Sequence, residues 1–322
     1  MAKTTSVQTV LGPLLTSELG PTFSHEHILI APTGYESDPN LVFDYETMML
    51  QAIELMKELK ATGINSIVDP APMELGRNVE FIADVAEGSG MNIICSTGVY
   101  FESGPFAGLP TYYKSRRPEE LEAIYRKEIE EGAGPRKIRP GVIKCATSSF
   151  EITEAEAKAL SVAGRAARAT DTRITTHTQE GTMGQEQLNL FEEEGVPPHH
   201  VTIGHCSDSK DMDYLAGIAK RGAYIGFDRV GIEAWVNDEI KLGMIAGLVA
   251  MGFERHIVLS HDNVGCSHAP RATRRPPDPK RRFTLIHEEF IPAMKRAGIS
   301  ERTIETMLVD NIRRFFEGDE TP

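Results

Sequence analysis

Short apolar runs rich in Val, Ile and Thr recur along the chain at similar intervals. A run of this kind is typical of a buried strand, because strands are short and favour β-branched residues. Eight such runs lie at residues 22–28, 64–69, 92–98, 141–147, 173–178, 200–206, 223–228 and 256–262. The pattern therefore predicts eight strands.

The segments between these runs have the spacing of amphipathic helices. In one of them, apolar residues separated by three or four positions would share a single face: Met49, Ala52, Ile53, Met56 and Leu59. A glycine often follows such a segment, at or shortly before the next strand, as do Gly63, Gly90, Gly195, Gly222 and Gly252. A residue without Cβ adopts the left-handed conformation that ends a helix most easily, so these glycines are predicted to end helices.

A strand followed by a helix, repeated eight times without a low-complexity linker, predicts an α/β protein with a single domain over residues 1–322. Parallel βα units of this number close into one (β/α)8 barrel, the TIM barrel. A doubly wound open sheet is the alternative, but it often has a glycine-rich turn after the first strand, where this chain has His25, Glu26 and His27. Two segments rich in Pro and Gly, 101–120 and 263–282, are predicted lids over the barrel mouth.

Charge and composition exclude several classes of partner. The 34 Lys and Arg against 47 Asp and Glu give a net charge of −13, which disfavours nucleic acid and anionic lipid surfaces. The longest apolar run, 242–253, is shorter than the roughly 20 residues of a membrane-spanning helix, and the first residues show no apolar signal core. We therefore expect a soluble, cytoplasmic protein with no nucleic acid or membrane partner. Its four cysteines form no CxxC pair and are predicted to be free thiols.

Side chains that bind metals fall at the carboxyl ends of separate predicted strands. They are His25 and His27 in the first, Lys144 in the fourth, His177 in the fifth, His205 in the sixth and Asp262 in the eighth. A single histidine at a strand end is usually a core residue. In a barrel, however, these ends meet at the face where active sites lie. Imidazole and carboxylate together suit zinc, cobalt, iron or manganese, so the set predicts a metal site.

Lys144 does not fit this set as an ordinary ammonium, since a buried cation beside metal ions would be repelled and desolvated. One interpretation is a salt bridge from Lys144 to Asp262. The other is reaction of the Lys144 amine with carbon dioxide, which turns a cation into a carboxylate able to bridge two metal ions.

These motifs resemble the phosphotriesterase-related family of the amidohydrolase superfamily over essentially the whole chain. The matching stretches are Gly20, Thr22, His25, Glu26 and His27, then IVDP (67–70), GVY (98–100), VIKCAT (142–147), THT (176–178), IGHCSDS (203–209), IGFDRVG (225–231), LSHD (259–262) and VDNIRRFF (309–316).

The resemblance implies a site with two divalent ions, zinc or else cobalt, iron or manganese. His25, His27 and Asp262 would hold one ion, and His177 and His205 the other. A carboxylated Lys144 and a hydroxide would bridge both ions. The resemblance also implies a homodimer.

Within this family the sequence is similar to the phosphotriesterase-like lactonases, and especially to quorum-quenching N-acyl-homoserine lactonases. That branch has a Tyr after the third strand and an Asp-Arg pair after the seventh, here Tyr100, Asp228 and Arg229. Val230 stands where an aromatic residue often follows the Arg, and segment 263–282 lacks the Trp common in lactonases. These differences leave the preferred acyl chain length open.

The resemblance implies that a metal-bridging hydroxide opens the ring of an N-acyl-homoserine lactone, with weak promiscuous organophosphate hydrolysis. Asp262 would pass the proton to the leaving alkoxide. Tyr100 is predicted to hold the carbonyl or leaving oxygen, or else to be a rim aromatic. Arg229 would orient Asp228 or close the pocket floor, as a catalytic contact or as a structural salt bridge. Tyr100, Asp228, Arg229 and Trp235 are predicted to contact the substrate, and Cys206 is predicted to pack in the core.

The acyl tail of such a substrate predicts an apolar groove, formed by Phe101, Phe106, Leu109, Tyr112 and Trp235. The basic segment 271–282 would instead favour a phosphorylated ligand, unless it is an ordinary solvated loop. The alternative functions are therefore a phosphotriesterase or another hydrolase of esters or phosphorylated lactones. A binding module without catalysis is disfavoured, because it would not need a complete set of ligands.

Overall fold

The computed structural model describes residues 5–41, 43–102, 108–267 and 278–320. Its central sheet has eight parallel strands: β3 (Thr22–Phe23), β5 (Ser66–Asp69), β6 (Asn92–Gly98), β7 (Val142–Thr147), β8 (Arg173–Thr178), β9 (Val201–Ile203), β10 (Tyr224–Phe227) and β11 (Ile257–Leu259). Neighbours in the sheet follow the order of the chain. The Ser24 N–H donates to the Leu259 carbonyl at 3.2 Å and joins the two ends of the sheet. The predicted (β/α)8 barrel is therefore confirmed.

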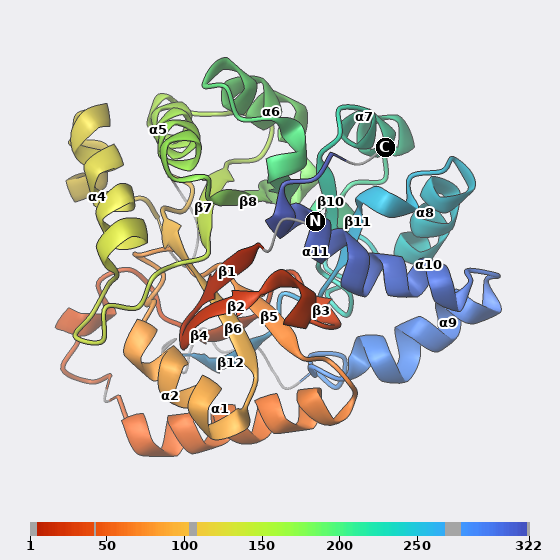
Figure 1. The fold of residues 1–322 in the computed structure, drawn as a ribbon, viewed down its shortest axis with the longest axis horizontal. Helices are drawn as coiled ribbons and strands as arrows, with labels where there is room; N and C mark the ends of the chain where they lie inside the picture. Colours follow the sequence, from red (N-terminus) through yellow and green to blue (C-terminus); the bar gives the residue numbers. More distant parts are fainter. Residues whose placement is uncertain (1–4, 42, 103–107, 268–277, 321–322) are drawn as a thin grey trace.

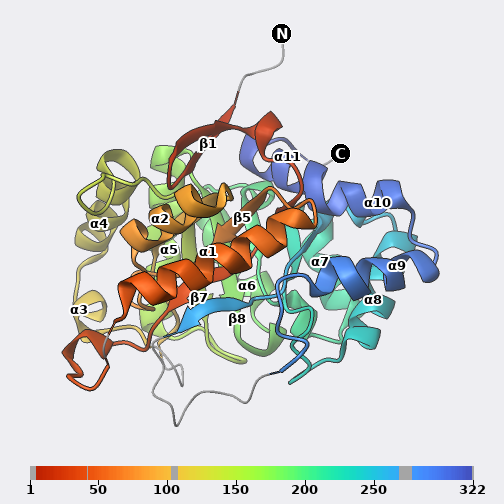
Figure 2. The ribbon, with the colours of Figure 1, turned by 90° about the horizontal axis from the view of Figure 1, so that it is seen from below.

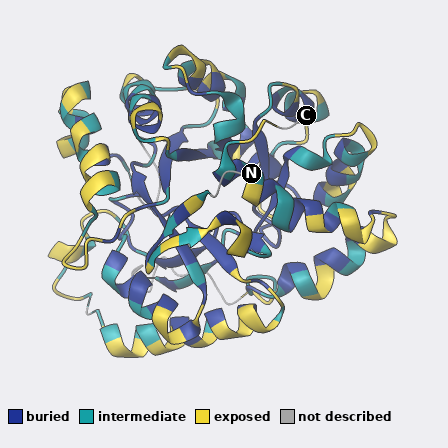
Figure 3. Ribbon diagram, viewed as in Figure 1, coloured by how far each residue is buried: buried dark blue, intermediate teal, exposed yellow. Residues whose placement is uncertain are grey.

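Helices surround these strands (Figure 1). They are α1 (Tyr45–Ala61), α2 (Val79–Ser89), α3 (Thr111–Lys114), α4 (Pro118–Glu131), α5 (Glu154–Thr170), α6 (Gly184–Glu193), α7 (Met212–Lys220), α8 (Asp238–Ala250), α9 (Ile291–Arg296), α10 (Glu301–Glu305) and α11 (Asn311–Glu317). Short 3-10 helices span Thr16–Glu18, Tyr35–Ser37, Gln179–Gly181, Pro198–His200, Cys206–Asp208 and Glu254–His256, and π-helical turns span Ile286–Phe290 and Thr306–Asp310. Figure 3 shows buried strands inside a ring of helices whose outer faces are exposed.

Polar side chains and glycines define the helix ends. Asn78, Thr153, Asp211 and Asn237 each accept a hydrogen bond from a backbone N–H in the first turn of the helix that follows. The five glycines predicted to end helices all have positive φ, from 69° at Gly90 to 98° at Gly63. That prediction is confirmed.

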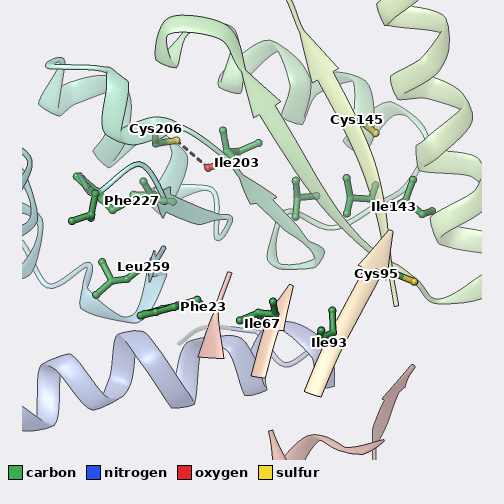
Figure 4. Close-up of a cluster of buried hydrophobic side chains, with 14 of the residues drawn as sticks. Phe23, Ile67, Ile93, Cys95, Ile143, Cys145, Ile203, Cys206, Phe227 and Leu259 are labelled. Carbon is green, nitrogen blue, oxygen red and sulfur yellow. Dashed lines mark hydrogen bonds between the residues drawn. The ribbon is translucent and has the colours of Figure 1, made fainter. Parts of the chain in front are cut away.

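Alternation along β7 decides which side chains enter the barrel. Ile143 and Cys145 lie in the buried hydrophobic cluster between strands and helices (Figure 4). Successive side chains of a strand point to opposite faces, so Lys144 points into the barrel. The four cysteines are buried free thiols, and Cys206 donates to the Ile203 carbonyl at 3.2 Å, as expected of a core residue.

The amino-terminal end of the barrel is closed by apolar side chains. Val68, Ile94, Val142, Tyr224 and Val258 of the strands pack there with Ile312, Phe315 and Phe316 of α11. A hairpin of β1 (Ser6–Thr9) and β2 (Gly12–Leu15), which the sequence pattern did not predict, packs on this end through Val7 and Leu14. Figure 2 shows the hairpin beside α11. The residues of the predicted site therefore lie toward the opposite end.

The first predicted strand, 22–28, is wrong as one element. It divides into β3 and β4 (His27–Ile30), and β4 pairs with β12 (Val264–Ser267) outside the main sheet. Between them the Ser24 N–H donates to the Leu259 carbonyl, and the Glu26 N–H donates to the Val68 carbonyl at 2.9 Å. The chain thus crosses from one neighbouring strand to the other, so His25 and His27 do not share a single strand.

The two predicted lids are described in part. Segment 101–120 contains α3 and the start of α4, and segment 263–282 contains β12. Phe106 and residues 271–277 of the basic segment lie outside the described residues. Over the part of the chain that the structure describes, no helix has the length and apolar character needed to cross a membrane.

Candidate metal centre

The predicted ligands come together at the carboxyl ends of the strands. Asp262 Oδ1 lies 3.3 Å from His27 Nε2 and 3.7 Å from His25 Nε2. The His205 ring centroid lies 4.6 Å from that of His25 and 4.4 Å from that of His177. The four buried imidazoles and the partly exposed Asp262 therefore form one cluster.

Each imidazole uses one ring nitrogen for a hydrogen bond outside this cluster. The partners are Asp228 Oδ2 for His25 Nδ1 (3.2 Å), Asp69 Oδ1 for His27 Nδ1 (3.1 Å), Gln179 Oε1 for His177 Nε2 (2.8 Å) and Asp228 Oδ1 for His205 Nδ1 (3.0 Å). Hydrogen bonds of this kind fix the tautomer and orientation of histidines that bind metals. The second nitrogen of each ring is the one that would bind an ion.

Electrostatics also favour a metal ion here. Burial lowers the pKa of His25, lowers the pKa of His177 well below its usual value and lowers the pKa of His205 to about 3, so these rings are neutral ligands. Burial acts in the same direction on His27, but hydrogen bonds to Asp262 and Asp69 outweigh it and raise the pKa of His27 to about 9. Asp262 and Asp69 thus stabilise a positive charge beside imidazoles that are themselves neutral. Divalent cations fit this arrangement.

Two of the ligands have backbone conformations that residues with a Cβ rarely adopt. His205 has φ of 60° and Asp262 has φ of 55°, in the left-handed region that costs roughly 1–2 kcal/mol per residue. Hydrogen bonds hold both: the His205 N–H donates to Asp228 Oδ1 at 2.8 Å, and the Asp262 N–H donates to the His25 carbonyl at 3.1 Å. Such strain persists where the surroundings require it, and it clusters at functional sites.

Lys144 lies against the histidine cluster and is 1% exposed. Its Nζ lies 3.2 Å from the Thr176 carbonyl and 3.5 Å from His25 Nε2. No ion pair joins Lys144 to Asp262 within 4.0 Å, so the salt bridge that the sequence allowed is not formed. Burial lowers the pKa of Lys144 to about 8, which increases the share of the neutral amine.

Asp228 lies beneath the cluster and is 1% exposed. Its carboxylate also lies within 4.8 Å of ligand atoms of His25 and His205, but it contacts their Nδ1 atoms, which makes it a partner of the rings. The sequence predicted a substrate contact for Asp228, and this burial does not fit one.

Arg229 pairs with two acids other than Asp228, so the first of its two predicted roles, orienting Asp228, is not formed. Its Nη1 lies 2.5 Å from Asp208 Oδ2 and its Nε lies 3.0 Å from Asp262 Oδ2. Arg229 therefore holds Asp262, the acid on the other side of the cluster. The indole of Trp235 lies against it, with the guanidinium carbon 4.9 Å from the ring centroid.

Tyr100 borders the cluster beside His177. Its hydroxyl lies 3.4 Å from His177 Nδ1, and its backbone N–H donates to Glu74 Oε1 at 2.5 Å. Phe101 stacks on His177, with centroids 5.1 Å apart and planes 22° apart. Tyr100 and Phe101 thus lie beside the candidate ligand His177, whereas Trp235 lies beside Arg229.

The apolar groove predicted from the sequence is not formed by its described members. Leu109 is 4% exposed and packs in the main core. Tyr112 is 54% exposed, and the guanidinium carbon of Arg116 lies 4.2 Å from its ring centroid. Of the other described members, Phe101 stacks on the candidate ligand His177, and Trp235 contacts Arg229.

Sequence reasoning missed the residues that position the ligands. Two of them bond to candidate ligands: Asp69 to His27 and Gln179 to His177. Glu26 accepts the backbone N–H that follows Asp262, and Asp208 accepts from Arg229. Asp69 was visible as the acid that ends the strand IVD, and Gln179 as the polar residue that follows THT. The sequence does not distinguish a polar residue at a strand end that binds a metal ion from one that bonds to the ring of a metal-binding histidine.

Comparison with known proteins decides the family. The sequence pattern of the Phosphotriesterase family matches residues 5–316. The chain belongs to the phosphotriesterase family. This is a family of binuclear metal enzymes, and the chain is a hydrolase.

Individual relatives of this phosphotriesterase-family protein match over nearly their whole length. The aryldialkylphosphatase of Saccharolobus solfataricus is 30% identical over 93% of this chain and 95% of its own. A phospho-furanose lactonase of Mycoplasmopsis synoviae is 30% identical over 97% and 92%. The structure of an organophosphorus hydrolase from Deinococcus radiodurans aligns with a TM-score of 0.92 and 32% identity over 98% of both chains. The family and the lactonase branch predicted from the sequence are confirmed.

Proposed function

We propose that the protein is a metal-dependent lactonase that opens N-acyl-homoserine lactones. The observation that supports this best is the position of Tyr100 and of the Arg229–Trp235 pair, which border the cluster beside His177 and Asp262 respectively. A phenol and an aromatic-capped guanidinium suit an uncharged ester with an apolar part. The similarity to a phospho-furanose lactonase supports ring opening as the reaction.

The ligand set fits two divalent ions. In this proposal His25, His27 and Asp262 would hold one ion, His177 and His205 would hold the other, and a carboxylated Lys144 would supply a further carboxylate to both. Zinc is the proposed metal, with cobalt, iron and manganese as alternatives. Such ions supply Lewis acidity at the lactone carbonyl and lower the pKa of a water molecule.

Asp262 moves the proton in this proposal. Burial opposes the charge of Asp262, but the Arg229 guanidinium and the hydrogen bond from His27 outweigh it and keep the pKa of Asp262 well below its usual value. As a carboxylate it can accept a proton from the attacking water and return it to the leaving alkoxide.

Tyr100 serves as a donor. Burial raises the pKa of its phenol, so the hydroxyl keeps its proton and can donate to the carbonyl or the leaving oxygen.

A phosphorylated lactone or a phosphate ester is the second candidate substrate. Arg281 from the basic segment donates to the Asp262 carbonyl at 2.8 Å, which brings a cation beside the site. The neighbouring cations are less suited to bind phosphate, because Lys280 pairs with Glu233 at 2.8 Å and Arg282 with Glu288 at 2.9 Å. The similarities to an aryldialkylphosphatase and to a phospho-furanose lactonase support this candidate.

Acid release from a series of N-acyl-homoserine lactones, from short to long acyl chains, tests the proposal. The metal-loaded protein is compared with a chelated sample, and a phosphorylated lactone and an aryl dialkyl phosphate are assayed in parallel. Chelator-sensitive ring opening that depends on chain length supports the homoserine lactonase. Faster turnover of the phosphorylated lactone or the phosphate ester would select the second candidate, and binding of a lactone without acid release would contradict catalysis.

A further inference from the structure

Lys241 of α8 is a fully buried lysine, 0% exposed, that is not part of the metal cluster. Its Nζ lies 2.6 Å from the Arg229 carbonyl, 2.7 Å from the Ile232 carbonyl and 2.9 Å from Asp238 Oδ1. An ammonium has three donors and no acceptor, so these three oxygens satisfy it completely. A buried charge with all its hydrogen bonds made is costly to disturb, which makes Lys241 a fixed anchor.

The contacts of Lys241 fix the segment 229–232 that follows β10. Asp238, its counter-ion, also accepts the Gly231 N–H at 3.0 and 3.1 Å. Gly231 has φ of 90°, and a Cβ there would lie 2.7 Å from the Lys280 carbonyl. Lys241 therefore binds two carbonyls of the segment, and Asp238 binds one of its N–H groups. The segment also packs closely against the backbone of Lys280.

Two proposed substrate-binding residues depend on this segment. Arg229 is its first residue, and Trp235 follows it and contacts the Arg229 guanidinium. Because the Arg229 backbone carbonyl accepts from Lys241 while its side chain binds Asp262 and Asp208, both ends of the residue are fixed.

We propose that Lys241 is a positioning residue, which together with Asp238 sets the place of Arg229 and Trp235 and so governs how the enzyme binds the apolar part of its substrate. The effect of Lys241 on substrate binding rests on the proposed lactonase function. The effect of Lys241 on the position of the segment 229–232 does not, because it depends only on contacts within the chain.

Replacing the ammonium would release the segment, although Lys241 itself is bonded to none of the proposed metal ligands. In Lys241→Met an apolar chain of similar length leaves the Ile232 carbonyl without its donor and Asp238 without its counter-charge. The Arg229 carbonyl keeps only its bond from the Ile232 N–H at 3.0 Å. Loss of such buried partners shifts an equilibrium by about tenfold or more, so the KM for a lactone rises by about that factor.

Trp235 is the single tryptophan of the chain, so its fluorescence reports directly on this segment. The experiment measures acrylamide quenching of Trp235, together with KM and kcat, in the metal-loaded full chain of wild type and Lys241→Met. Lys220→Met, which removes an exposed lysine of α7, is the matched control. Stronger quenching and a raised KM in Lys241→Met alone support the proposal, and a folded Lys241→Met with unchanged quenching and KM overturns it.

Asp238→Asn keeps the experiment decisive if Lys241→Met does not fold. The amide keeps the shape of Asp238 but removes the charge and one acceptor. Quenching of Trp235 therefore increases if Lys241 and Asp238 hold the segment 229–232. A folded Asp238→Asn with wild-type quenching overturns the proposal. If the wild type opens no lactone, the proposed function fails, while the quenching comparison still decides the role of Lys241.

Discussion

His261 Nδ1 lies 2.7 Å from Glu26 Oε1, and both side chains are completely buried. The Ile286 N–H donates to His261 Nε2 at 3.0 Å, so Nε2 is an acceptor and the proton is on Nδ1. Glu26 also accepts the backbone N–H groups of His261 and Asn263, each at 2.9 Å. These residues flank Asp262 on both sides, so Glu26 fixes the backbone that aims Asp262 at the cluster.

Glu26→Gln is therefore expected to lower kcat by on the order of 10-fold to 100-fold while the metal content stays the same. The amide keeps the size of the side chain but turns an NH2 group toward an N–H donor. Steady-state kinetics and metal analysis on the folded variant check this, with the exposed Glu58→Gln as control. Wild-type kcat in Glu26→Gln would remove the positioning role.

Lys144→Ala is expected to lose much of the bound metal and, with it, activity. The proposed carbamate supplies a bridging carboxylate that alanine cannot supply. Metal stoichiometry and activity are measured with and without added short carboxylic acids, which should restore part of both. Full metal occupancy and activity in the unsupplemented variant would contradict the carbamate.

Asp262→Asn is expected to keep most of its metal but to lose turnover by orders of magnitude. An amide can still coordinate through its oxygen, but it cannot accept a proton at neutral pH. The pH dependence of kcat in wild type and variant checks the assignment. Undiminished turnover would show that another group moves the proton.

Glu74→Gln is expected to remove part of the pH dependence of stability. Burial raises the pKa of Glu74 from 4.5 to about 7, so the folded protein binds this proton more tightly than the unfolded chain does. The stabilising contribution is full below about pH 4.5 and is lost as the pH rises through about 7, a difference of up to roughly 3 kcal/mol.

The amide also accepts the Tyr100 N–H, so the fold is preserved. Urea unfolding of wild type and Glu74→Gln near pH 5 and near pH 8 measures the effect. The variant should gain stability relative to wild type at the higher pH, whereas the exposed Glu18→Gln should not. Equal pH dependence in wild type and Glu74→Gln would show that Glu74 stays ionised without cost.

The barrel and the members of the candidate metal cluster could be predicted from the order of residues along the chain. Both follow from local rules. Successive side chains of a strand point to opposite faces, so Lys144 points away from the face of Ile143 and Cys145. His177 and His205 follow or end their strands, and in a barrel these carboxyl ends meet at the mouth. Such rules act within one strand or helix, so neighbouring residues are enough to apply them.

Only the tertiary structure decided which side chains pair across the barrel. Arg229 binds Asp262, 33 positions away, and not the adjacent Asp228. Glu26 divides the first predicted strand because its partners come from residues 260–263, over 230 positions away. Lys241 bonds to carbonyls of the segment 229–232, which carry no sequence signal at all. The free energy of a buried charge depends on the donors and acceptors that surround it in space, and those are fixed only when all eight strands are packed.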